Sequence, residues 1–242
     1  MPLGLIGMTR GDQIFGHRDH FGDIGRGAGH RLLMGRPLDG GLQRPNGGHV
    51  IQKPLRRLIR DIANATSLLM RLELEGISVG ERWAELADLA QNRIDDGCLV
   101  FADLHYMLAL TGGNRTTDSQ SLLTRFSQDA TKSGEMNKIT ADPGVAAAIG
   151  LNAFAEGRYS EAFNNLAAAR PNLQAIGGSH AQRDVFERIT IDAGLRAGHY
   201  EQTEAILTHR LVHRGGAEDS FAVSRFTALD TARLDASRIP AQ

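Results

Sequence analysis

Residues 145–169 read VAAAIGLNAFAEGRYSEAFNNLAAA, and this stretch decides the fold. Gly157 stands near its centre, where a glycine is typical of the turn between two helices. Gly150 lies seven residues before Gly157. Two, five, nine and twelve residues after Gly157 come Tyr159, Ala162, Leu166 and Ala169. Because small residues let two helices approach and bulky residues fill the space between them, the stretch predicts an antiparallel helical hairpin.

The same spacing recurs once towards the C-terminus. Gly198 and Tyr200 follow 41 residues after the glycine and tyrosine of the first hairpin, and Leu207 takes the bulky position, although Thr203 replaces the alanine. These positions match the tetratricopeptide pattern, and no segment alternates as a strand would. The sequence therefore predicts an all-α fold, a tetratricopeptide-like α-solenoid of stacked antiparallel helical hairpins. The predicted repeat-packing residues are Gly150, Gly157, Tyr159, Ala162, Leu166, Gly198 and Tyr200.

Further helices are predicted ahead of this region. Apolar residues recur at spacings of three and four from Leu55, which indicates a helix that ends near Gly76. Ser78 and Glu81 have the spacing of a capping box for the next helix, whose apolar stripe runs over residues 83–94. Together these two helices form a predicted hairpin.

Three more segments complete the predicted architecture. A second hairpin begins with a helix over about residues 98–111, turns at the glycines 112–113 and resumes after Thr117. Residues 134–142 are predicted to be a connection, and a last helix over about residues 221–234 would cap the array.

The chain divides into three parts by composition. Residues 1–54 hold thirteen of the 28 glycines and show no helical or strand period, so they are predicted to be disordered or a misassigned start of the chain. Residues 55–235 form the predicted helical-repeat domain, and residues 236–242 form a tail.

Composition excludes several classes of protein. The net charge of −1 argues against a nucleic-acid or membrane-surface protein, since binding phosphates requires an excess of Lys and Arg. One cysteine, Cys98, excludes an internal disulfide framework, and no apolar run reaches the roughly 18 residues of a membrane span. We therefore expect a cytoplasmic protein with no nucleic-acid or membrane partner.

Two motifs near the N-terminus suggest metal or nucleotide binding but lack the necessary context. His17 and His20 lie in a glycine-rich segment without a scaffold, whereas a metal site needs three or four placed ligands. The GRGAG motif at residues 25–29 has no preceding strand and no adequate following helix, which a dinucleotide site requires. We expect no metal and no cofactor.

The segment IGGSHAQRD, residues 176–184, is the best candidate for a binding site. Ser179 and Gln182 have capping-box spacing, which places His180, Arg183 and Asp184 in the first turns of a helix. The free N–H groups there would suit an anion such as a peptide carboxylate. Alternatively the segment is structural, with Arg183 paired to a carboxylate and His180 packed under the turn. The candidate residues are His180, Gln182, Arg183 and Asp184.

Asp103 and His105 are further candidates for ligand contact. They lie two residues apart on a predicted helix, so their side chains diverge and cannot form a dyad directly. Within an apolar helix, His105 is more typical of a buried, hydrogen-bonded packing residue than of a ligand contact. No set of residues forms a recognisable triad, so no catalytic residue is predicted.

Three segments carry a family resemblance: SLLMRLELEGISVGERWAELAD (67–88), FADLHYMLAL (101–110) and AIGGSHAQRDVFE (175–187). Together they resemble the tetratricopeptide repeat protein 38 family over about residues 60–230, the C-terminal portion of the family pattern. The resemblance implies stacked helical hairpins and an interaction role, without an established reaction, in a truncated member of a longer family. Met70 stands where the family pattern implies tryptophan.

The leading functional hypothesis is a non-catalytic interaction module that binds a peptide or partner protein on its concave face. The alternatives are an enzyme or enzyme-accessory protein with a polar pocket around residues 177–184, and a fragment without independent function. An enzyme should bring the candidate residues together in one pocket with perturbed pKa values. A fragment should expose the apolar face of its first helix, residues 55–74.

Overall fold

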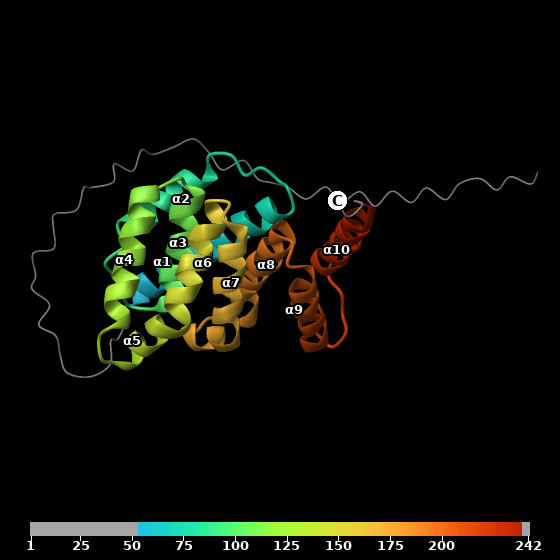
Figure 1. Ribbon diagram of the computed structural model, residues 1–242. Coiled ribbons are helices and arrows are strands. Elements are labelled where there is room, and N and C mark those ends of the chain that lie inside the picture. The colour runs from blue at the N-terminus through green and yellow to red at the C-terminus, as the bar shows by residue number, and fades with distance from the viewer. Residues whose placement is uncertain (1–52, 239–242) are drawn as a thin grey trace, which may run out of the picture. The chain divides into compact units, whose positions relative to one another are not determined.

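Every regular element in residues 53–238, the part of the chain that this computed structural model describes, is helical (Figure 1). The prediction of an all-α fold is confirmed. Two short helical turns, η1 (Thr140–Gly144) and η2 (Arg170–Ile176), precede α6 and follow α7. The helices are α1 (Lys53–Leu74), α2 (Arg82–Gln91), α3 (Val100–Gly112), α4 (Thr116–Ala130), α5 (Glu135–Ile139), α6 (Val145–Ala155), α7 (Tyr159–Ala169), α8 (His180–Ala197), α9 (Tyr200–His213) and α10 (Ser220–Arg238).

Three helical hairpins, α3/α4, α6/α7 and α8/α9, share one turn geometry (Figure 1). The turns lie at Asn114, Gly157 and Gly198, whose φ angles are 56°, 74° and 77°. In each turn the next residue donates its backbone N–H to the carbonyl five residues earlier, at 2.8, 2.9 and 2.9 Å. This bond satisfies one of the last carbonyls of the first helix before the chain reverses. The described part of the chain thus contains a repeated helical unit.

The glycines 112–113 end α3, as predicted, and they also have a role in packing. Helix α3 continues through Gly112, and the residue with positive φ is Asn114. A Cβ at Gly112 would lie 2.5 Å from the ring of Trp83, and one at Gly113 would clash with the side chain of Ala87. Both glycines therefore allow α2 to pack closely on α3, and the turn forms just beyond them.

Small residues also set the spacing inside two of these hairpins. Counted along the chain with α1/α2 as the first, α6/α7 is the third hairpin and α8/α9 is the fourth. A Cβ at Gly150 would lie 2.6 Å from Leu166, the bulky residue of the predicted pattern. In the fourth hairpin, Gly194 leaves room for Thr203, because a Cβ at Gly194 would clash with the threonine hydroxyl. The corresponding position in the third hairpin, 41 residues earlier, holds Ala153. The larger residue at 203 is thus accommodated by a smaller one at 194.

Helix α1 packs against α3 and α8, although α8 lies more than 100 residues later in the chain. Its residues Ile59, Ile62 and Leu69 are buried there, as the predicted apolar face requires. Leu68, on the other side of the helix, is 56% exposed. The described side chains of α1 therefore do not present the exposed apolar face that the fragment hypothesis expects. Met70, where the family resemblance implies tryptophan, is also buried.

Two predicted details of local structure are wrong. Ser78 and Glu81 do not form a capping box, since α2 begins at Arg82 without a side-chain cap. Instead Val79 is buried and its carbonyl accepts a 2.8 Å hydrogen bond from Arg82, which holds the connection. The segment 134–142 is not a simple connection, because α5 and part of η1 lie within it.

The predicted domain boundaries can be compared with the structure only within the described residues. Helix α1 begins at Lys53, two residues before the predicted start of the helical domain at Leu55. The remainder of the predicted N-terminal segment, and residues 239–242 of the predicted tail, lie outside the described residues. Within residues 53–238, no helix combines the length and the apolar character needed to cross a bilayer.

Candidate functional site

The segment before α8 forms a capped turn. The Ser179 hydroxyl accepts a hydrogen bond from the backbone N–H of Gln182 at 3.3 Å, and the Gln182 side chain accepts one from the Ser179 N–H at 2.9 Å. This reciprocal pair is the predicted capping box. Gly178 has a φ of 72° and lies so close to the ring of Phe101 that a side chain would clash. The turn is therefore anchored on α3, which positions the start of α8.

Arg183 and His180 differ in their contacts. The Arg183 guanidinium donates through one nitrogen, Nη1, to the carbonyls of Gly177, at 2.8 Å, and Gly178. Arg183 therefore stabilises its own turn. The structural alternative instead predicts that Arg183 pairs with a carboxylate. His180 is exposed and has no hydrogen bond or ion pair with any residue that the structure describes.

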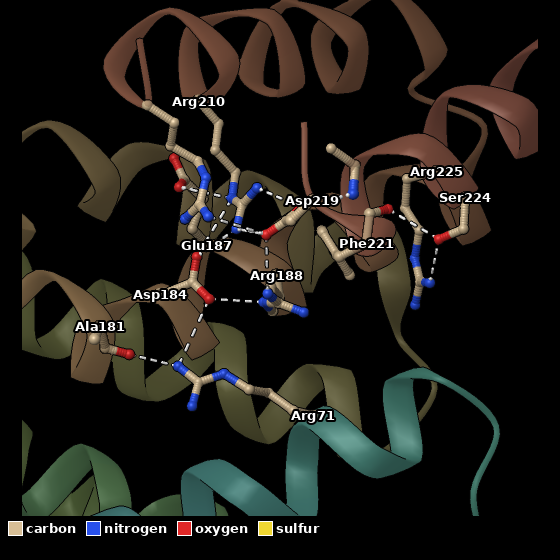
Figure 2. A network of polar contacts seen from close by, with 12 residues as sticks. Arg71, Ala181, Asp184, Glu187, Arg188, Arg210, Asp219, Phe221, Ser224 and Arg225 are labelled. Carbon is tan, nitrogen blue, oxygen red and sulfur yellow. Dashed lines mark hydrogen bonds and ion pairs between the residues drawn. The ribbon is translucent and has the colours of Figure 1, made fainter. Parts of the chain in front are cut away.

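Asp184 lies at the centre of an ion-pair network (Figure 2). Its carboxylate accepts hydrogen bonds from Arg188 at 2.7 Å and from Arg210 of α9 at 2.8 Å, and it lies 3.6 Å from Arg71 of α1. Burial opposes ionisation of this carboxyl, but the arginines outweigh burial and hold the pKa of Asp184 below its usual value. The arginines thus favour the charged form of Asp184, which joins α8 to α1 and α9.

The network continues to the start of α10. Asp219 accepts two hydrogen bonds from Arg210, at 2.8 and 3.0 Å, and one from the backbone N–H of Ala222. Despite partial burial, the bonds from Arg210 and Ala222 lower the pKa of Asp219 to about 2. Since Asp219 also pairs with Arg188 at 3.2 Å, one carboxylate couples α8, α9 and α10.

An arginine of α10 itself, Arg225, completes the attachment of this helix. Arg225 donates to Asp192 of α8 at 2.9 Å, and to Glu75 and the carbonyl of Leu74 at the end of α1. Phe221 lies between Arg188 and Arg225, each with its guanidinium carbon 4.4 Å from the ring centre. Figure 2 shows the phenyl ring among these guanidinium groups. Cation–π contact and ion pairing therefore act together at α10.

The sequence analysis did not identify Arg210, Asp219 and Arg225 as functional candidates. The sequence pattern around Arg210 and Arg225 nevertheless indicates that both are buried. Arg210 follows the buried pair Ile206 and Leu207 at helical spacing, and Arg225 falls on the buried face of α10. An arginine on the apolar face of a helix requires a buried acidic partner, because an unpaired charge there is very costly. This rule predicts that Arg210 and Arg225 each have an acidic partner, but it does not identify the partner residue.

A groove of about 960 Å³ opens beside this network, between the end of α7, η2, α8 and the end of α9. Apolar residues such as Leu173 and Phe186 form part of its wall. Two acidic residues, Asp184 and Glu187, also line it. The basic residues around the groove are Arg71, Arg170, Arg183, Arg188, Arg210, Arg214, His180, His209 and His213. Three predicted candidates, His180, Arg183 and Asp184, thus share one groove.

Gln182 lies beside the groove, and its side chain makes hydrogen bonds within the protein. Besides its capping bond, its side-chain nitrogen lies 3.4 Å from the side-chain oxygen of Asn64 on α1. Its contacts therefore tie the start of α8 to α1.

Asp103 and His105 lie in the protein core, not in the groove. His105 Nδ1 lies 2.7 Å from the carbonyl oxygen of Phe101 and must donate to it, so Nε2 accepts from the Ser67 hydroxyl at 3.1 Å. The ring packs against those of Phe101 and Phe186. Asp103 pairs with Arg125 at 2.7 Å, and burial raises its pKa to about 6 although Arg125 acts in the opposite direction. Neither side chain is placed to contact a ligand in the groove.

His105 should make folding sensitive to acid. Burial lowers its pKa from 6.5 to about 4, so between these values the unfolded chain binds a proton that the folded chain does not. Stability present at pH 7 is therefore lost as the pH falls through this window. Between pH 7 and pH 5 we expect the unaltered protein to lose about 2 kcal/mol more stability than His105→Gln.

Urea titrations of both proteins at the two pH values measure this difference. Asp103, whose raised pKa changes stability in the opposite sense, is present in both proteins and cancels. Parallel pH profiles for the two proteins would show that His105 is protonated in the folded state, contrary to its assigned hydrogen bonds.

Comparison with known proteins gave no family model and no solved structure that matches the chain. Among the described residues, no group of three or more His, Cys, Asp or Glu side chains is arranged to hold a metal ion. His17, His20 and the GRGAG motif at residues 25–29 lie outside those residues.

Proposed function

We propose that this protein is a non-catalytic helical-repeat module that binds a peptide or an extended segment of a partner protein. The observation that carries the proposal is the open groove between α7, η2, α8 and α9, with apolar walls and arginine and histidine side chains around them. A groove of about 960 Å³ has the size typical of a binding site. Extended peptides in such grooves combine apolar anchoring with polar contacts.

The repeat class in this proposal is tetratricopeptide-like. Support comes from the common turn geometry of the three hairpins and from the close packing of Gly150 on Leu166. The resemblance of residues 60–230 to the tetratricopeptide repeat protein 38 family belongs to the same proposal. The cytoplasm is the proposed compartment, on the basis of the single cysteine, Cys98.

The proposed binding face differs from the concave surface expected for an open solenoid. In such arrays the first helices of successive hairpins line the inner face. Here α1 packs on α3 and α8, which are the first helices of two hairpins. Helix α1 therefore covers the faces of these two helices that a ligand would otherwise contact. The groove at the ends of α7 and α9 is left open, so we assign the ligand to it.

The contacts in the groove favour binding over catalysis. A general base needs a free carboxylate or imidazole with a pKa near the working pH. Asp184 is bonded to arginines that lower its pKa, and Arg183 is bonded to its own turn. His105 and Asp103 lie in the core and do not join the polar groups of the groove. None of these four residues is therefore a free base, and His180, the remaining candidate in the groove, has no hydrogen bond to a described residue that would orient it.

Selection from a random peptide library tests the proposed function. Peptides selected on the unaltered protein should bind Gln174→Trp at least tenfold more weakly, because the exposed Gln174 lines the groove and an indole there would fill it. Gln128→Trp on α4, also exposed and outside the groove, is the matched control and should bind normally. Failure to enrich any peptide, or equal binding to both variants, would overturn the proposal.

A further inference from the structure

The groove has an excess of positive charge that its own residues do not neutralise. Three carboxylates, those of Asp184, Glu187 and Asp219, are within reach of the arginines. The arginines are Arg71, Arg170, Arg183, Arg188, Arg210 and Arg214. Six arginines against three carboxylates leave an excess of three positive charges before any histidine is counted. Charges of like sign in a partly desolvated groove repel one another, so an anionic occupant would lower their energy.

Donors remain free on two separate segments that line the groove. Near the start of α8, Arg183 uses only Nη1, so its other guanidinium nitrogens and the His180 ring have no hydrogen bond to a described residue. Near the end of α9, Arg214 has only a 3.6 Å contact with Asp219, and its side chain is 46% exposed. These donors lie on two separate helices, which matches an extended ligand with several anionic groups.

The end of α7 and the end of α9 present further polar side chains to the groove. Arg170 donates to Glu187 at 2.9 Å and to Nδ1 of His209 at 2.6 Å. His209 stacks on His213 with ring centres 3.9 Å apart. Glu187 therefore offsets the charge of Arg170, and the two stacked imidazoles add polar groups to the wall of the groove.

Deepening the proposed function, on which this step rests, we propose that the partner segment is acidic, with several Asp or Glu side chains. Carboxylates match the free guanidinium donors in charge and in planar geometry. The chain's own residues 1–52 do not fit as occupant, since they hold six basic against four acidic residues. A nucleic acid fits less well, because residues 61–242 hold 24 acidic against 17 basic residues, which disfavours a long polyanion.

Fluorescence polarisation with labelled twelve-residue peptides tests this inference. The probes are a Glu/Asp-rich peptide, its Gln/Asn counterpart and its Lys counterpart. The acidic peptide should bind at least tenfold more tightly than the other two, and raising the salt from 50 to 300 mM should weaken its binding several-fold. Equal binding of the acidic and Gln/Asn peptides would overturn the inference.

Charge reversal locates the interaction. The double variant His180→Glu, Arg214→Glu should lose at least tenfold in affinity for the acidic peptide, because it reverses or adds charge on two separate segments that line the groove. Lys138→Glu on α5, where the lysine is 73% exposed, is the matched control and should bind normally. Thermal unfolding of each variant verifies that it is folded.

The outcomes separate this inference from the proposed function. One outcome is that selected peptides bind the groove and lose this binding in Gln174→Trp. If these peptides are not acidic, the inference fails and the proposed function stands. If no peptide binds the groove, the proposed function itself fails. If a single-stranded oligonucleotide of equal charge binds more tightly than the acidic peptide, the inference of an acidic protein segment is overturned in favour of a nucleic acid.

Discussion

Replacing Arg210 by alanine should lower the free energy of unfolding by about 3 kcal/mol. Arg210 is only 3% exposed, and its guanidinium bonds both Asp184 and Asp219. Its removal would leave two partly buried carboxylates that share Arg188 alone, at 2.7 and 3.2 Å, in place of two arginines. Breaking one member of a buried ion network is costly because the remaining charges are no longer compensated. Urea unfolding monitored by circular dichroism gives the difference.

Arg214 provides the matched control. It contacts the same carboxylate, Asp219, but at 3.6 Å and from an exposed position. Arg214→Ala should change stability by less than about 0.5 kcal/mol, as is typical of exposed ion pairs. A similar loss for Arg210→Ala and Arg214→Ala would show that the network contributes through general charge balance, contrary to the role assigned to the buried contacts.

Gly194→Ala should cost about 3 kcal/mol, at the upper end for adding one methyl group to a packed interior. The new Cβ would clash with the Thr203 hydroxyl and lie 2.8 Å from the ring of Phe163. Because α8 and α9 are held together by their short turn at Gly198, the helices cannot separate freely to relieve the clash. Thermal or urea unfolding measures the loss.

A second substitution should rescue much of that loss. Thr203→Ala in the Gly194→Ala background restores the alanine pair found 41 residues earlier at Ala153 and Ala162. The two substitutions should show a favourable coupling of about 1–2 kcal/mol in a double-mutant cycle, because residues in contact are not additive. Strict additivity would mean that the two side chains do not limit the approach of the helices.

Gly198→Ala is an informative contrast to Gly194→Ala. Nothing lies within 4 Å of a Cβ at Gly198, but its φ of 77° is unfavourable for a side chain. Its expected cost of about 1 kcal/mol comes from backbone strain alone. The difference between the two glycine substitutions therefore separates close packing from turn geometry.

Local features of the fold were predictable because they depend on neighbours in the chain. The turns at Gly157 and Gly198 and the capping box of Ser179 with Gln182 involve residues only a few positions apart. The prediction that the helix ends at the glycines 112–113 was confirmed, but it missed a second role of these residues. Glycine is typical of a turn, but here it serves a contact with Trp83 and Ala87 on another helix, which no local pattern reveals.

The candidate site was predictable only in part. His180, Arg183 and Asp184 were identified because the start of a helix concentrates them in one turn. The partners of Asp184 come from α1 and α9, so its role in joining helices could not be read from its own segment. Asp103 and His105 were candidates because of their residue types, and burial within α3 removes them from the groove.

The sequence by itself determined the helical class, the two hairpin turns and the cap that starts α8, because backbone propensity, small-residue spacing and capping act over one or two helical turns. Only the tertiary structure decided that α1 packs on α8 and that Arg210 joins Asp184 to Asp219, which lie 35 residues apart. Close packing and ion pairing depend on which surfaces meet, and the meeting of distant helices is set by the free energy of the whole core.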